Sequence, residues 1–200
     1  MKGSLIVLSI FLLGMLLAYV GVVPKALTDY DLSSVALYFL MFMVGVSIGA
    51  DDHALSIIRS VNLKIVLVPI AVVLGTTVGS FLVALAVKGI DTRNVMAIGS
   101  GFGYYSLSSI FIGKYSGNEM GVVALLANMI REISTLMLAP IYVRYFGTLS
   151  PVAAAGATAM DTCLPIIVKY SGKEMAIAAL FSGIALTILV PFLVVFILQL

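Results

Sequence analysis

The chain is very apolar for its length. Of its 200 residues, 62% are hydrophobic and only 10% are charged, whereas a soluble domain carries roughly a quarter charged residues. The 11 basic and 9 acidic side chains leave a formal charge of +2, and no basic run favours nucleic acid or anionic lipid as a partner. The single cysteine, Cys163, cannot form an intramolecular disulfide. Composition therefore predicts an integral membrane protein, and nothing in it implies a metal or a cofactor.

Hydropathy divides the chain into about seven apolar segments, found with a window of about 20 residues, the length that a helix needs to cross hydrocarbon. In chain order they are 4–23, 33–49, 65–87, 94–113, 120–143, 150–168 and 175–198. The first follows Lys2 as the core of a signal peptide would, but it is longer than the roughly 7–15 apolar residues of such a peptide. The expected fold is an all-α polytopic membrane protein in the cell membrane.

An internal repeat with an offset of 55 residues marks the C-terminal half. Residues 114–120, Lys-Tyr-Ser-Gly-Asn-Glu-Met, return as Lys-Tyr-Ser-Gly-Lys-Glu-Met at 169–175, and eight of the twelve positions that begin at Lys114 are identical. The same offset pairs two further positions upstream, Gly101 with Gly156 and Ser106 with Asp161. Each copy consists of a polar, glycine-containing apolar segment, a short loop and a long apolar helix. Repeated units with interrupted helices are typical of membrane transporters.

We therefore expect one membrane domain made of three parts. A three-helix N-terminal unit (1–88) precedes the first repeat (93–145) and the second repeat (148–200).

The two shorter segments of the repeats, 94–113 and 150–168, are poor candidates for continuous helices. They contain the residues that weaken or break a helix, namely Gly101, Gly103, Gly156 and Pro165. In hydrocarbon, irregular backbone normally lines a cavity, because its freed polar groups must be satisfied by protein, water or substrate. Glycine and proline are also common in membrane helices as packing positions or kinks. Their occurrence at corresponding positions of two repeats, beside polar side chains, favours a binding site.

Three ionisable residues lie well inside apolar segments: Arg131, Glu132 and Asp161. A charge at the bilayer centre costs at least about 2.5–3.5 kcal/mol on insertion scales, so each needs a partner, a wet cavity or a changed protonation state. Asp161 lies midway along an interrupted segment and is the strongest candidate for a group that exchanges a proton for a cationic substrate. The alternative is a structural carboxylate that pairs permanently with Arg131.

Asn128 belongs to the same group because it lies four residues before Glu132 and shares its helix face. Arg131 points about 100° away from Glu132 on a helix with 3.6 residues per turn. We expect the face of Asn128 and Glu132 to turn toward the interrupted segments. Arg131 would then either bond a carbonyl of an interrupted helix or pair with Asp161.

At these residues the sequence resembles a known family. Three motifs carry the resemblance: Gly-Phe-Gly-Tyr-Tyr-Ser-Leu-Ser at 101–108, Asn128 with Arg131 and Glu132, and Gly-Ala-Thr-Ala-Met-Asp-Thr at 156–162 followed by Leu164 and Pro165. In this order, over about residues 35–195, they resemble the LysO lysine exporter family. The resemblance implies export of L-lysine and close cationic analogues across the cytoplasmic membrane, with Asp161 as the functional membrane acid. The expected substrate and proton site comprises Asp161, Glu132, Asn128, Arg131, Ser106, Tyr104, Tyr105, Thr158 and Thr162.

The chemistry of lysine agrees with this set. Lysine carries two ammonium groups and one carboxylate, so its site needs an acceptor such as Asp161 or Glu132, and donors such as half-helix N-termini or Arg131. Exporting its net positive charge against an inside-negative potential costs about 2.3 kcal/mol per 100 mV. Inward movement of one proton in exchange cancels this electrical cost, so proton antiport is the expected mechanism.

Two other kinds of protein remain as alternatives. An intramembrane aspartyl protease needs two facing aspartates, and only Asp161 lies deep in an apolar segment, so no enzyme is expected. A non-transporting membrane subunit or an ion channel would use Asp161 and Arg131 as a structural pair. Better-known members of the resembled family look longer, with additional N-terminal membrane segments, so we expect a homodimer or a small membrane partner subunit.

Overall fold

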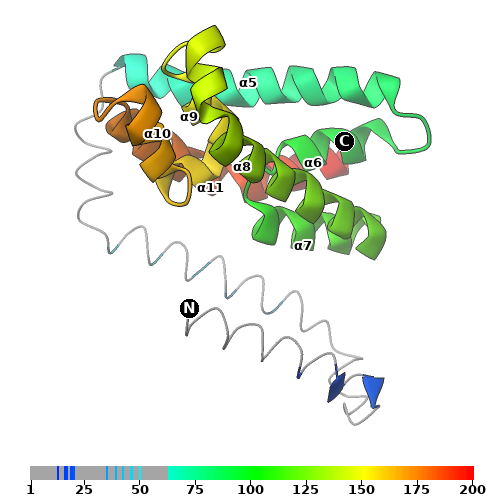
Figure 1. The fold of residues 1–200 in the computed structure, drawn as a ribbon. Helices are drawn as coiled ribbons and strands as arrows, with labels where there is room; N and C mark the ends of the chain where they lie inside the picture. The colour runs from blue at the N-terminus through cyan, green and yellow to red at the C-terminus, as the bar shows by residue number, and fades with distance from the viewer. Residues whose placement is uncertain are drawn as a thin grey trace. The chain divides into compact units, whose positions relative to one another are not determined.

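The computed structural model describes residues 63–200 continuously, together with isolated positions at 13, 16, 17, 19, 20, 35, 39, 42, 46 and 50. The chain divides into two compact units, 1–43 and 44–200, and both repeats belong to the second. The expected segments 4–23 and 33–49 lie outside the described residues except for those isolated positions. From residue 63 onward the structure is all helical and contains no strand (Figure 1).

Three long helices form the frame of this unit: α5 (Leu63–Ala86), α8 (Asn118–Phe146) and α11 (Met175–Gln199). Each is long and apolar enough to cross a membrane, since even the shortest spans about 36 Å at 1.5 Å per residue and hydrocarbon is about 30 Å thick. They confirm the long helices expected at 65–87, 120–143 and 175–198. The three helices differ in the share of buried residues within the apolar 18-residue window of each. This share is 50% in α11, 28% in α8 and 11% in α5, so α11 is the central helix of the three.

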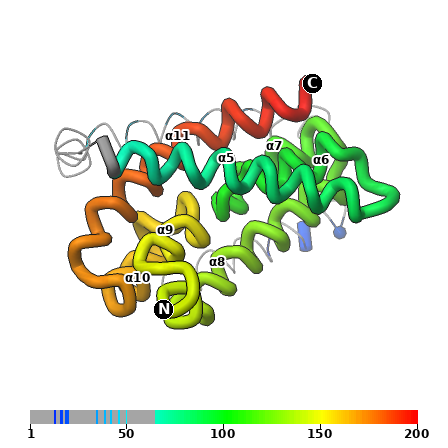
Figure 2. The backbone as a smooth tube through the Cα atoms, turned by 90° about the horizontal axis from the view of Figure 1, so that it is seen from above, coloured from blue at the N-terminus to red at the C-terminus, as the bar shows by residue number. Residues whose placement is uncertain are grey.

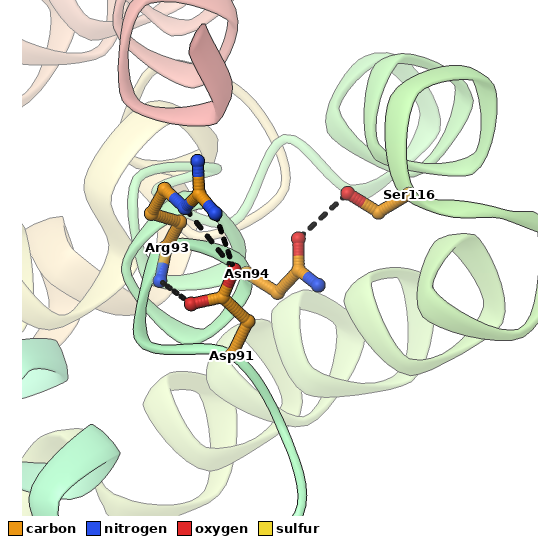
Figure 3. Close-up of polar contacts among 4 residues, drawn as sticks. All are labelled: Asp91, Arg93, Asn94 and Ser116. Carbon is orange, nitrogen blue, oxygen red and sulfur yellow. Dashed lines mark hydrogen bonds and ion pairs between the residues drawn. The ribbon is translucent and has the colours of Figure 1, made fainter. Parts of the chain in front are cut away.

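The first interrupted segment folds into a helical hairpin, made of α6 (Thr92–Gly99) and α7 (Tyr105–Ser116). The side chain of Asp91 caps α6, accepting from the Arg93 backbone N–H at 3.3 Å and from Arg93 Nε at 3.1 Å. One turn further, Asn94 Oδ1 accepts a hydrogen bond of 2.6 Å from the Ser116 hydroxyl (Figure 3). Because Asn94 lies near the start of α6 and Ser116 is the last residue of α7, the chain doubles back between them. The hairpin is at most about 18 Å deep, roughly half the bilayer.

The second interrupted segment contains α9 (Ser150–Ala155), the 3₁₀-helix η1 (Gly156–Met160) and α10 (Leu164–Ser171). Val152 of α9 and Ile167 of α10 belong to one buried core cluster, and the two helices lie side by side in both views of the backbone (Figure 1; Figure 2). This segment is therefore a second hairpin.

Pro165 has a different place from the one expected. It is the second residue of α10, where a helix leaves the backbone N–H without an internal partner in any case. Pro165 therefore starts a helix, and the interruption expected at this residue is made instead by η1 and residues 161–163.

The 55-residue repeat is visible in the backbone. Gly117 joins α7 to α8 with φ 93° and ψ 156°, and Gly172 ends α10 with φ 98° and ψ 158°. Their N–H groups donate to the carbonyls of Gly113 and Val168, which are again 55 residues apart. Positive φ of this kind favours glycine strongly. The repeat predicted from sequence thus ends each hairpin with the same turn.

The two hairpins open toward opposite ends of α8. The first opens at Gly117, where α8 begins, and the second follows Gly147, where α8 ends. From the open end of the second hairpin, α11 runs back toward α6 and α7 (Figure 2). The repeats are therefore inverted relative to each other, as in many secondary transporters.

Candidate functional site at the hairpin tips

The closed ends of the two hairpins, here called the tips (residues 100–104 and 156–163), meet inside the unit. The Phe102 carbonyl accepts a hydrogen bond of 2.8 Å from the Ala157 N–H. Phe102 is fully buried. Its φ of 46° is positive, and in the described part of the chain no other non-glycine residue has a positive φ. A Cβ at Gly156 would overlap the Phe102 carbonyl oxygen, and one at Gly103 would lie 2.9 Å from the Ala155 carbonyl oxygen. Glycine at both tips is what allows the two backbones to meet.

Asn128 holds the first tip to α8. Its Oδ1 accepts from the Gly103 N–H at 2.8 Å, and its Nδ2 donates at 3.0 Å both to the Ile98 carbonyl and to the Ala124 carbonyl. The side chain is 3% exposed. Gly101 packs beneath it, since a Cβ there would lie 2.6 Å from Asn128 Nδ2. Asn128 therefore accepts from the Gly103 N–H of the first tip and adds a second donor to the Ile98 carbonyl, which also accepts from the Gly101 N–H.

Arg131, one turn further along α8, holds the second hairpin. Its Nε donates to the Ala154 carbonyl at 2.8 Å and its Nη2 to the Ala153 carbonyl at 3.0 Å. Both terminal nitrogens lie 3.5 Å from the Thr76 hydroxyl of α5, and the guanidinium carbon lies 5.8 Å from the centroid of the Phe102 ring. Of the two partners considered for Arg131, a carbonyl of an interrupted helix is the one observed. The part of the chain that the structure describes contains no ion pair between Arg131 and Asp161.

Glu132 is on the buried face of α8 and is 8% exposed. Asn128 and Thr135 share this face, so the expectation that it turns toward the interrupted segments is confirmed. Among the described residues, no hydrogen bond or ion pair reaches the Glu132 carboxyl group. Cys163, the fully buried last residue of the second tip, lies within electrostatic range of both Glu132 and Asp161. Glu132 lies one turn along α8 from Asn128, which holds the first tip, and Asp161 lies in the second tip.

Asp161 is exposed at the second tip, directly after η1. Its Oδ1 accepts a hydrogen bond of 2.6 Å from the Thr162 N–H and lies 3.3 Å from the Thr162 hydroxyl. Tyr104, the half-buried residue immediately before α7, lies within electrostatic range of Asp161. The structure therefore brings the acid expected from sequence within electrostatic range of a tyrosine at the other tip.

The other expected site residues fall into two groups. Ser106 and Thr162 are exposed and Tyr105 is half-buried. Thr158, in contrast, is 8% exposed and uses its hydroxyl within its own tip, donating to the Ala155 carbonyl at 3.1 Å and lying 3.5 Å from Cys163 Sγ.

Sequence reasoning missed two residues that shape the site. Ser108 is fully buried, and its hydroxyl donates to the Tyr104 carbonyl at 2.9 Å, which ties the first tip to α7. Thr76 meets Arg131 from α5. The serine was visible in the motif at 101–108, but a lone threonine in a long apolar helix carries no signal that could have identified it.

Comparison with known proteins identifies the family. Residues 8–198 match the model of the family described as lysine exporter LysO. The chain belongs to the LysO family. It is 31% identical to the lysine exporter LysO of Escherichia coli over 166 residues, which are 83% of this chain and 54% of that protein. It is also 31% identical over 160 residues to a Haemophilus influenzae protein named as a candidate lysine exporter, and the match covers 80% of each chain.

The chain spans about half the length of the Escherichia coli relative. No solved structure gives a significant match. Membership of the LysO family, together with the long apolar helices, makes this chain an integral protein of the cell membrane and a member of a transporter family rather than an enzyme family.

Proposed function

We propose that this LysO-family chain exports L-lysine and close cationic analogues across the cytoplasmic membrane in exchange for protons. The observation that carries the proposal is the meeting of two inverted hairpin tips beside two carboxyl groups, Asp161 and Glu132. Asn128, which holds the first tip, lies about 15 Å along α8 from its start, or roughly half the thickness of hydrocarbon. Binding sites of secondary transporters lie at this depth, between interrupted helices of repeated units. We infer that both hairpins enter the membrane from opposite sides without crossing it.

The proposed site separates acceptors from donors. Asp161 and Glu132 supply negative charge for an ammonium group of the substrate. No side chain caps the first turn of α7, although the Tyr105 N–H donates to the Gly103 carbonyl. The N–H groups that follow and the positive end of the helix dipole suit the substrate carboxylate. The hydroxyls proposed to complete the site come from Tyr104, Tyr105, Ser106 and Thr162.

Exchange at a shared acid explains how charge balances. When Asp161 binds the cationic substrate from the cytoplasm it is ionised. After the substrate is released outside, Asp161 takes a proton from that outer side and gives it up on the cytoplasmic side before the next substrate binds. Export of one lysine cation and entry of one proton move no net charge, so the cost of about 2.3 kcal/mol per 100 mV disappears. Glu132, buried without a partner in the described part of the chain, is proposed to assist as a second acceptor.

The alternative of a non-transporting subunit or an ion channel requires a structural pair of Asp161 and Arg131. Arg131 instead bonds the carbonyls of Ala153 and Ala154, and this observation favours the exporter.

Counterflow in proteoliposomes tests the proposal. Vesicles loaded with unlabelled amino acid are given labelled L-lysine, with lysine, arginine, ornithine and leucine as the internal amino acid in turn. We expect lysine to exchange fastest and leucine hardly at all, because leucine would leave a desolvated carboxylate of the site unpaired. Equal exchange for leucine and lysine would contradict the proposal.

A further inference from the structure

Asn128 and Arg131 stand one turn apart on α8, and each holds the backbone of a different hairpin. We infer that they are positioning residues, which set the place of the Asp161 tip relative to the Tyr104 tip, and that neither binds the transported substrate. This inference rests on the proposed function for its meaning in transport. The placement of the tips can also be measured without transport.

The Asn128 amide has no N–H group left to donate to a ligand. Both of its N–H groups donate to carbonyls, those of Ile98 and Ala124, and its oxygen already accepts from Gly103. The side chain is 3% exposed. The oxygen keeps one further acceptor position, but so buried a side chain gives a substrate little access to it.

Arg131 likewise hydrogen-bonds backbone groups, in this case those of the second hairpin. Its two strong hydrogen bonds go to Ala153 and Ala154 in the last turn of α9, where the helix leaves carbonyls without internal partners. A cation at this end also compensates the negative end of the helix dipole. The guanidinium carbon lies 5.8 Å from the centroid of the Phe102 ring of the first tip, so Arg131 lies between the second hairpin and the first tip.

This arrangement links Arg131 to Asp161. Ala155, next to the carbonyls that Arg131 holds, accepts from the Thr158 hydroxyl, and the Thr158 carbonyl accepts from the Asp161 N–H at 3.3 Å and the Cys163 N–H at 3.0 Å. Each step is a hydrogen bond within a few residues of chain. Loss of the Arg131 bonds would therefore free the end of α9 and, through η1, the carboxylate at the tip.

The test compares Arg131→Gln and Arg131→Lys with Arg144→Gln, a matched control near the exposed end of the same helix, whose side chain stacks on Tyr145. Lysine counterflow gives KM and the maximal rate over a range of pH. For a positioning role we expect Arg131→Gln to lower the maximal rate at least tenfold and to displace the pH profile, because the surroundings of Asp161 change. Arg131→Lys, which can still donate to one carbonyl, should recover part of the rate, and Arg144→Gln should match the unaltered protein.

A second readout uses spin labels on cysteines placed at Ser106 and Thr162, both exposed, in a Cys163→Ser background. We expect the distance distribution between the labels to broaden with Arg131→Gln and to stay narrow with Arg144→Gln. A raised KM with an unchanged maximal rate and an unchanged distance distribution would mean that Arg131 binds the substrate carboxylate, and it would overturn the inference. An unaltered distance distribution alone would overturn it as well.

The two readouts separate this inference from the proposed function. If the unaltered protein shows no lysine counterflow, the proposed function fails, and the label distances alone decide whether Arg131 positions the tips. If Arg131→Gln does not fold, Arg131→Lys carries both measurements, with a narrow distribution and full rate counting against the inference.

Discussion

Replacing Gly156 by alanine tests whether the contact between the hairpin tips organises the site. The matched control is Gly147→Ala in the loop after α8, because both glycines have positive φ, 68° and 87°, while a Cβ at Gly147 would meet nothing within 4 Å. At both positions alanine suffers backbone strain of about 1–3 kcal/mol. At Gly156 the added methyl group also overlaps the Phe102 carbonyl oxygen and lies 3.0 Å from its carbon.

The extra cost at Gly156 can be worked from these contacts. Forcing a methyl group into packed backbone costs about 1–3 kcal/mol, and loss of the Phe102–Ala157 hydrogen bond adds about 0.5–1.5 kcal/mol. Gly156→Ala should therefore destabilise the protein by about 2–4 kcal/mol more than Gly147→Ala. At about 2–4 °C per kcal/mol for a chain of this size, the difference in Tm should be on the order of 5–15 °C.

The assay is thermal unfolding of the purified variants in detergent, followed by lysine counterflow at a temperature where both are folded. We expect Gly147→Ala to keep its counterflow and Gly156→Ala to lose most of it, because Asp161 is carried by the displaced tip. Equal Tm values and equal flux in the two variants would refute the reasoning that the tips must touch.

Two further predictions address topology and the acid. In a Cys163→Ser background, we place single cysteines at Lys88, Glu119 and Lys173 and treat them with an impermeant maleimide. If the first hairpin does not cross, as proposed, the cysteines at Lys88 and Glu119 should react from one side of the membrane and the cysteine at Lys173 from the other. Reaction of the first two from opposite sides would show that the hairpin crosses. Asp161→Asn should abolish pH-driven lysine export and change Tm by no more than about 1–2 °C, the usual range for an exposed side chain, and a large loss of stability would instead point to a structural role.

Sequence alone could predict the long helices and the repeat, but not the hairpins. A hydropathy window responds to about 20 apolar residues, and 94–113 satisfies it whether the chain crosses or doubles back. The hydrogen bond between Asn94 and Ser116 distinguishes the two cases, and its partners lie 22 residues apart with no periodic pattern that relates them. Pro165 shows the same difficulty, since the effect of a proline depends on whether a helix begins or continues there.

The candidate site, too, could be predicted from the sequence only in part. The types of residue that gather at the tips could be predicted, because polar and ionisable groups in apolar segments are rare. The partner of Arg131 could be narrowed to a carbonyl or to Asp161, but not decided. Its observed partners are the main-chain carbonyls of Ala153 and Ala154. Every residue has such a carbonyl, so the sequence does not indicate which one an arginine will bond.

The hairpins also decide on which side of the membrane several basic residues lie, and these residues influence membrane orientation. If neither hairpin crosses, one side of the bilayer receives Lys88, Arg93 and Lys114, and the other receives Lys64, Arg144, Lys169 and Lys173. Orientation in a membrane follows the excess of lysine and arginine on the cytoplasmic side, and here the two sides are nearly balanced. The charges of this part of the chain therefore favour neither orientation strongly, and a gain or loss of one or two of them would be enough to reverse the preference.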